Sequence, residues 1–175
     1  VPAGVGAMAA IVGLPPGEVQ AACREAEQGE AVSPANYNSP EQTVIAGHAG
    51  AVARASEGCL ARGAKRAIPL PVSAPFHCAL MSPARERLRP LLEASAFSDA
   101  RWPVVTNVDA APAREGSRLR DALVRQVDSP VRWVEAVQRL AQEGVDRGLE
   151  IGPGNVLAGL VRRIERGIKV EGYSG

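Results

Sequence analysis

The first 75 residues contain short apolar segments whose spacing alternates between that of strands and that of helices. Helical segments place apolar side chains three and four positions apart, and strand segments are short apolar runs bounded by turn residues. The segments are a strand at 8–14, a helix at 19–26, strands at 31–37 and 43–45, a helix at 52–60 and a strand at 68–72. In this order they predict the split βαβ, or ferredoxin-like, motif.

Turn and stop residues support these boundaries. Asn38–Pro40 separates the second and third strands, so we expect a hairpin there. Gly29 and Gly63 end the two helices. The last strand contains Pro69 and Pro71, which confine it to a sheet edge or to irregular pairing. The helix faces expected to be buried are Val19, Ala22, Cys23 and Ala26 in the first helix and Val52, Ser56, Cys59 and Leu60 in the second.

The remaining residues, 76–175, indicate alternating α/β structure, as in a parallel sheet covered by helices. The predicted elements are helices that begin near Ser82, Ser117, Val131 and Asn155 and strands at 103–108 and 148–151. Ser82 and Asn155 are expected to cap their helices. Two strands are too few for a stable sheet. We therefore expect residues 1–75 to form a ferredoxin-like subdomain and residues 76–175 to be part of a larger α/β subdomain, with an N-terminal portion missing from this chain.

Composition and charge narrow the possible functions. Hydrophobic residues make up 46% of the sequence, enough for a packed core. No run approaches the roughly 20 apolar residues of a membrane span, so we expect no membrane association. The net charge of +1 makes nucleic acid an unexpected partner. The three cysteines have no C-x-x-C spacing, which argues against disulfides and a metal site and favours a reducing, cytoplasmic location.

The two histidines of the chain are His48 and His77. We interpret His48, which precedes a polar helix, as solvated. His77 follows the proline-containing strand, at the boundary between the two predicted architectures, where clefts form. A catalytic histidine needs a partner that fixes its tautomer and a nucleophile to deprotonate. Cys78 is unsuited as that nucleophile, because adjacent side chains point in different directions, and no G-x-S-x-G elbow occurs in the sequence.

Seven sequence blocks, all in the same order, resemble the malonyl-CoA:acyl carrier protein transacylases of bacterial fatty acid synthesis. The blocks are Gly6–Leu14, Ser33–Gly47, Pro69–Met81, Val105–Asp109, Asp121–Gln126, Ser129–Trp133 and Glu150–Leu157. They cover nearly the whole chain, and only residues 167–175 carry no recognisable pattern. The resemblance implies an α/β-hydrolase-like subdomain interrupted by a ferredoxin-like one, in agreement with the elements predicted above.

The resemblance also implies roles for five residues. His77 matches the catalytic base that activates a serine and later the carrier-protein thiol, and Gln126 matches a position whose carbonyl group orients the ring. Phe76 matches a residue common in malonyl-selective members. Asn36 and Asn38 match a motif that faces the cleft, although asparagines are also ordinary turn residues. The family's serine nucleophile, oxyanion glutamine and malonyl-binding arginine match nothing on this chain, so we expect the chain alone to be inactive.

The implied substrates and partners are malonyl-CoA and acyl carrier protein, with no cofactor, because phosphopantetheine belongs to the carrier. Three explanations for the missing portion remain open: it was cut off, it was lost, or it is supplied as a separate chain. Arg162, Arg163 and Arg166 form a basic cluster on the last helix, which is either a solvated face or a contact for an acidic carrier. An acyltransferase domain of a polyketide synthase and a non-catalytic module that binds carrier protein remain alternative functions.

Overall fold

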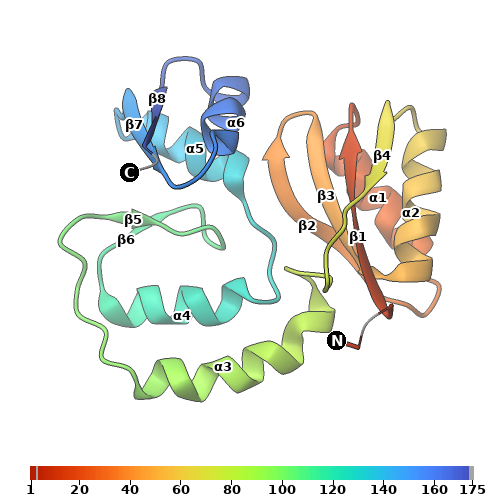
Figure 1. Cartoon of the computed structure of the whole chain (residues 1–175), viewed down its shortest axis with the longest axis horizontal. Coiled ribbons are helices and arrows are strands. Elements are labelled where there is room, and N and C mark those ends of the chain that lie inside the picture. The colour runs from red at the N-terminus through yellow and green to blue at the C-terminus, as the bar shows by residue number, and fades with distance from the viewer. Residues whose placement is uncertain (3, 174–175) are drawn as a thin grey trace.

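The computed structural model describes residues 1–2 and 4–173, and its first part is a four-stranded antiparallel sheet with helices on one face (Figure 1). The elements are β1 (Gly6–Val12), α1 (Pro16–Ala26), β2 (Val32–Ser39), β3 (Gln42–His48), α2 (Ala49–Ala61) and β4 (Arg66–Pro69). The strand order is β2-β3-β1-β4, with each neighbouring pair antiparallel. This is the split βαβ arrangement, so the predicted element order and the β2–β3 hairpin are confirmed.

Helices α1 and α2 cover one face of the sheet because each carries an apolar stripe. The residues buried on α1 are the predicted ones, Val19, Ala22, Cys23 and Ala26. Those buried on α2 are Ala51, Val52, Ala55 and Cys59. The predicted α2 face was therefore partly wrong, since Leu60 is 47% exposed. The two helices pack closely, because a Cβ added to Gly58 on α2 would lie 3.6 Å from Ala22 Cβ on α1. Alanine fits between helices at this distance better than larger side chains do.

The opposite face of the sheet carries a second, smaller apolar cluster. Its buried members are Met8, Ala10, Ala35, Val44, Ala46 and Cys78. Because Cys78 belongs to the loop after β4, this cluster anchors the loop to the sheet. β4 lies at the sheet edge, as its prolines predicted, but ends at Pro69 rather than at residue 72. The last hydrogen bond to β1 runs from Leu70 N to Met8 O at 2.9 Å, and Pro71 has no N–H with which to continue.

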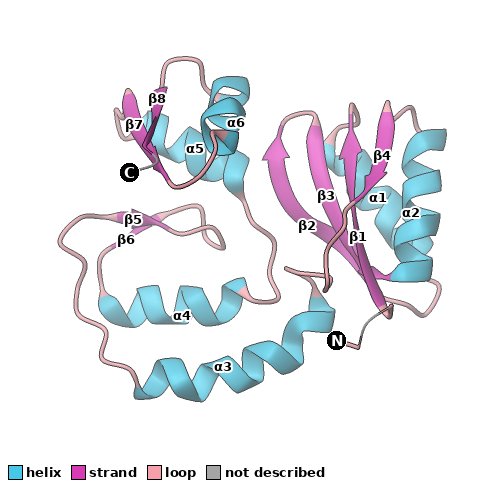
Figure 2. Ribbon diagram, in the orientation of Figure 1, coloured by secondary structure: helices cyan, strands magenta, loops and turns pink. Residues whose placement is uncertain are grey.

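The second part consists of helices and short strands joined by long loops (Figure 2). Its elements are the 3-10 helix η1 (Ala79–Met81), α3 (Ser82–Ala94), β5 (Val104–Val105), β6 (Pro112–Ala113), α4 (Gly116–Gln126), α5 (Trp133–Gln142), β7 (Arg147–Ile151), α6 (Val156–Ile164) and β8 (Lys169–Tyr173). β7 and β8 are parallel and joined through α6, in keeping with the predicted α/β alternation. The strand predicted at 103–108 shortens to β5, because its partner β6 is equally short. β8 lies where no sequence pattern was recognised.

One predicted helix cap was wrong and the other was right in position. α3 starts at Ser82 itself, and its N-terminus has no side-chain cap. Asn155 occupies the N-cap position of α6, as predicted, but its side chain makes no capping hydrogen bond. Instead the carboxylate of Glu150 on β7 accepts hydrogen bonds from the N–H groups of Leu157 at 3.0 Å and Ala158 at 2.8 Å. A carboxylate from a neighbouring strand therefore satisfies the free N–H groups of this helix.

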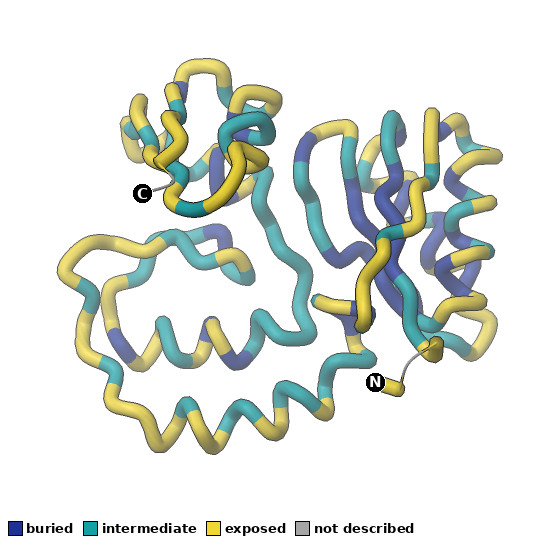
Figure 3. Tube along the Cα trace, viewed as in Figure 1, coloured by how far each residue is buried: buried dark blue, intermediate teal, exposed yellow. Residues whose placement is uncertain are grey.

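The two parts of the chain meet along β2. Val131 pairs with Asn36 in an isolated parallel bridge. Its N–H donates to Ala35 O at 2.8 Å, and its carbonyl accepts from Tyr37 N at 2.9 Å. Buried residues concentrate in the sheet and its helices, whereas the second part is mostly half-buried or exposed (Figure 3). In the described part of the chain, no helix is both long enough and apolar enough to cross a membrane.

Candidate active site

His77 lies in the loop between β4 and η1, which is held tightly on both sides. Pro75 is buried against β1, where a Cβ on Gly6 would lie 2.4 Å from the proline ring, so only glycine fits. On the other side, the buried Cys78 thiol donates to Pro75 O at 3.1 Å. Between these anchors His77 adopts a left-handed backbone with φ of +60°. Such a conformation costs on the order of 1–3 kcal/mol for a non-glycine residue and is common at functional sites.

The His77 ring is oriented by a backbone carbonyl. Nδ1 lies 2.9 Å from the main-chain oxygen of Gln126, which is 49 residues away in sequence. Because a carbonyl oxygen only accepts hydrogen bonds, Nδ1 carries the proton in this arrangement. The other ring nitrogen, Nε2, is then left with its lone pair. For the uncharged ring, the geometry therefore selects the tautomer in which Nε2 can act as a base.

The Gln126 carbonyl is available because α4 ends at this residue. The last carbonyls of a helix have no partner within the helix. The residue four positions on is Pro130, which has no N–H to offer. The Gln126 side chain lies beside the same ring nitrogen: its Nε2 is 3.3 Å from His77 Nδ1 and donates to Ser129 O at 3.1 Å. Its Oε1 is buried without a hydrogen-bond partner.

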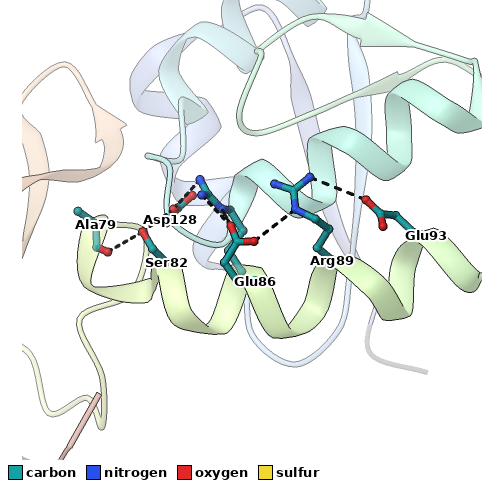
Figure 4. Close-up of polar contacts among 7 residues, drawn as sticks. Ala79, Ser82, Glu86, Arg89, Glu93 and Asp128 are labelled. Carbon is teal, nitrogen blue, oxygen red and sulfur yellow. Dashed lines mark hydrogen bonds and ion pairs between the residues drawn. The ribbon is translucent and has the colours of Figure 1, made fainter.

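A polar network fixes the loop after α4 to the start of α3 (Figure 4). Asp128 lies two residues beyond Gln126, and only 8% of its side chain is exposed. Its carboxylate accepts from Arg85 at 2.9 Å and lies 2.9 Å from the Ser82 hydroxyl. Because α3 follows the His77 loop directly, this network holds the histidine and its carbonyl partner in one unit. Asp128 was not predicted, because no pattern in the sequence pairs positions 85 and 128.

The other site residues predicted from the sequence are one neighbour of His77 and two asparagines on β2. Phe76 precedes His77, and its side chain is 40% exposed. Asn36 lies on β2 at the bridge to Val131, and Asn38 lies where the β2–β3 register shifts. Among the described residues, no hydrogen bond joins either asparagine to His77.

The remaining histidine and the neighbouring cysteine have structural roles. His48 was expected to be solvated, but its half-buried Nδ1 accepts from Ala31 N at 2.9 Å. Burial raises the pKa of the Cys78 thiol, which keeps it protonated and unreactive. Within the described ranges, no serine hydroxyl is hydrogen-bonded to His77. The site thus contains a candidate base and the carbonyl that orients it, with no hydroxyl or reactive thiol hydrogen-bonded to the ring among the described residues.

The comparisons with known proteins fit this geometry. Residues 2–173 match the family model of the acyl transferase domain. The malonyl CoA-acyl carrier protein transacylase of Escherichia coli (strain K12) is 53% identical over 94% of this chain and 53% of its own length. That of Bacillus subtilis is 47% identical over 97% of this chain and 54% of its own. The chain therefore spans about half the length of the curated relatives it matches.

Solved structures give the same answer. An acyl carrier protein S-malonyltransferase from Vibrio cholerae superposes with a TM-score of 0.97 at 48% identity, over 99% of this chain and 57% of that one. A malonyl-transacylase in complex with a type II polyketide synthase acyl-carrier protein gives 0.96 at 49% identity, over 99% and 56%. The chain belongs to the acyl transferase domain family, among the malonyl-CoA:acyl carrier protein transacylases.

Proposed function

We propose that this chain is the histidine-bearing half of an enzyme that transfers malonyl from malonyl-CoA to the phosphopantetheine thiol of acyl carrier protein, in fatty acid synthesis. The observation that carries the proposal is the 2.9 Å contact between His77 Nδ1 and the Gln126 carbonyl, which prepares Nε2 as a base. The serine nucleophile would come from a portion equivalent to the part of the relatives that lies outside the match. Identity near 50% over almost the whole chain supports this assignment.

In this mechanism His77 moves one proton in each direction during each half-reaction. Nε2 takes the serine proton as the serine oxygen attacks the thioester carbonyl, and it returns that proton to the departing thiolate of coenzyme A. In the second half, Nε2 takes the proton of the carrier thiol, the sulfur attacks the acyl-serine ester, and the proton goes back to the serine oxygen. The Gln126 carbonyl accepts from Nδ1–H throughout and stabilises the imidazolium. A neutral orienting group makes a weaker base than a carboxylate would, which suits an acyl-enzyme that must wait for a thiol rather than react with water.

Three further residues have proposed roles in binding substrate. Phe76 stands next to the base, and its bulk would crowd an α-methyl branch and so favour malonyl over methylmalonyl. Asn36 and Asn38 lie on β2, the strand that meets the second part of the chain, where they would line the cleft. We also propose a subdomain boundary at residues 75–76, in the loop between β4, which ends at Pro69, and η1, which begins at Ala79.

The proposed location is the cytoplasm. All three cysteines are free and buried, the usual state of thiols in a reducing compartment. Immunoblotting of fractionated cells tests this, with the protein expected alongside cytoplasmic markers and contradicted by a membrane or secreted fraction.

The experiment that tests the proposed function joins this chain to the portion of the Escherichia coli relative that lies outside the match. The purified hybrid is incubated with radiolabelled malonyl-CoA and then with the fatty acid synthesis carrier protein. We expect a labelled serine, followed by labelled carrier. A folded hybrid that forms no acyl-serine would overturn the proposal.

A polyketide synthase carrier is the second candidate acceptor. The observation in its favour is the likeness to a malonyl-transacylase solved with a type II polyketide synthase acyl-carrier protein. The same assay with both carriers compares their kcat/KM values and identifies the preferred acceptor.

A further inference from the structure

A pocket lined by arginines lies at the end of the sheet remote from His77. Its volume is about 590 Å³, and it is enclosed by α6, the β2–β3 turn and the adjoining ends of β1 and β4. Figure 1 shows α6 facing this end of the sheet. The charged residues that line the pocket are Arg66 on β4, Glu41 in the β2–β3 turn, and Arg163 and Arg166 in and after α6. Both parts of the chain therefore contribute to one pocket.

The pocket has an excess of positive charge that is not neutralised locally. Three guanidinium groups face a single carboxylate, that of Glu41. Within the described part of the chain, Arg66, Arg163 and Arg166 form no ion pair, unlike Arg85, which pairs with carboxylates. Free guanidinium groups provide the planar, forked donors that bind phosphate oxygens best. The pocket is therefore suited to a ligand that carries phosphate groups.

The pocket and the His77 loop share one face of the sheet. Arg66 lies opposite Val12 in the register of β1 and β4. Met8 lies on the same face as Val12, because side chains alternate along a strand. Cys78, the neighbour of His77, belongs to the same apolar cluster as Met8. Four residue steps of about 3.4 Å separate Met8 from Val12, so the arginines lie about 14 Å or more from the histidine loop along this face.

We infer that Arg66, Arg163 and Arg166 bind the phosphate groups at the far end of a phosphopantetheine arm whose thioester is at His77. The chain of the phosphopantetheine arm is as long as four to five residues of extended polypeptide, or about 15–18 Å. This length matches the separation of about 14 Å or more between the arginines and the His77 loop. The inference rests on the proposed function. Two donors share this chemistry, coenzyme A with its diphosphate and 3′-phosphate, and the carrier protein with its phosphodiester.

The test uses the hybrid enzyme described above and two variants of it. One is the single variant Arg66→Ala, and the other is the double variant that combines Arg163→Ala with Arg166→Ala. We expect the KM for malonyl-CoA to rise about tenfold, which corresponds to one charge-assisted hydrogen bond, with kcat little changed. Arg24→Ala is the control, because Arg24 is exposed on α1, which covers the other face of the sheet, and does not line the pocket. An unchanged KM for both malonyl-CoA and carrier protein in the pocket variants would overturn the inference.

Two further substrates identify the phosphate and exclude a general structural effect. With malonyl-pantetheine, which has no phosphate, the pocket variants should behave like the unmodified hybrid. An equal rise in KM for this substrate would also overturn the inference, because the arginines would then act without a phosphate. A rise confined to malonyl-CoA assigns the site to coenzyme A, and a rise confined to holo carrier protein assigns it to the carrier.

Direct binding separates this inference from the proposed function. Calorimetric titration of the hybrid with coenzyme A needs no turnover, and we expect the affinity to fall about tenfold in the pocket variants. If coenzyme A binding depends on the arginines but no malonyl is transferred, the proposed function fails and the phosphate site stands. If malonyl is transferred and both binding and KM are indifferent to the arginines, the phosphate site fails and the function stands.

Discussion

The two parts of this chain differ in how completely they bury their apolar residues. In the first part, the sheet and its helices enclose a continuous core around Ile11, Val19 and Ile45. In the second part, the main apolar cluster has only Val137, Val161 and Ile168 as its buried members. Its exposed large apolar residues include Val104, Leu123, Leu149, Ile151 and Val156. Apolar surfaces of this kind mark interaction sites, so the second part has the surface expected of a domain that packs against further protein.

The candidate base lies at the boundary between these two parts. His77 and the Gln126 carbonyl are both held there by local contacts. The chain spans 53% and 54% of the length of two relatives, and we propose that the nucleophile comes from the portion outside the match.

The most severe test of the comparison is to assay this chain without any other half. We expect no malonyl transfer above background, because no serine hydroxyl among the described residues contacts His77. Incubation with radiolabelled malonyl-CoA and carrier protein measures both acyl-enzyme and product. Stoichiometric labelling of a serine or of Cys78, followed by turnover, would show that the chain is a complete enzyme.

In the hybrid enzyme, His77→Ala should reduce kcat by about 10³-fold or more, because the base for both half-reactions is lost. His48→Ala is the matched control, since His48 binds a backbone N–H in the first part and takes no part in the proposed chemistry. We expect that control to retain activity within about tenfold of the parent. Equal activity of the two variants would reject the role of His77.

A matched pair of isoleucines tests the difference in packing directly. Ile11 is 0% exposed in the core of the first part, and Ile151 is 77% exposed on β7. In this chain alone, Ile11→Ala should reduce the free energy of unfolding by about 2–5 kcal/mol, and Ile151→Ala by no more than about 0.5 kcal/mol. Denaturant unfolding measures both. In the hybrid, a markedly larger cost for Ile151→Ala is expected, and an unchanged cost would mean that β7 stays exposed.

Asp128→Asn should reduce kcat of the hybrid by about tenfold. The nearly buried carboxylate of Asp128 joins the loop that contains Gln126 to α3 through Arg85. The neutral asparagine would be a weaker partner for Arg85 and would hold this loop less firmly. KM should change little, since Asp128 is a positioning residue. The control is Asp121→Asn on α4, whose 59% exposed carboxylate pairs with Arg125 at the surface and should matter less. A purely structural role for Asp128 would lower the melting temperature without changing kcat.

The smallest expected effect concerns selectivity. Phe76→Ser in the hybrid should reduce the preference for malonyl over methylmalonyl by about tenfold. This is the lower end of the effect of one methyl group, about 1–3 kcal/mol, because Phe76 is 40% exposed. Competition between the two thioesters gives the ratio of kcat/KM values. A preference that stays the same or increases would show that Phe76 does not set selectivity.

The sequence predicted the first part well because its information is local. The apolar stripe of α1 and a turn near Pro40 determine these elements from neighbouring residues, although the turn was predicted at Asn38–Pro40 and lies at residues 40–41, after the end of β2. The second part was predicted less well. β5 was expected to be longer, and β8 was not predicted at all, because the length of a strand depends on partners that no local pattern reveals. Asp128 and Glu150 escaped notice for the same reason, since their partners come from other elements.

The partner of the His77 ring is a main-chain atom, and this affects how the site can vary in evolution. Replacing the Gln126 side chain leaves the main-chain carbonyl in place, so no substitution at position 126 removes the group that orients the ring. In a Ser-His-Asp triad, by contrast, substituting the aspartate removes the orienting group. What must be preserved is the end of α4 and the missing N–H of Pro130, which leave that oxygen without a helical partner. The orienting group of this site therefore depends on the backbone conformation at the end of α4. Mutations that lengthen α4 by one turn would remove the free carbonyl more effectively than any substitution of Gln126.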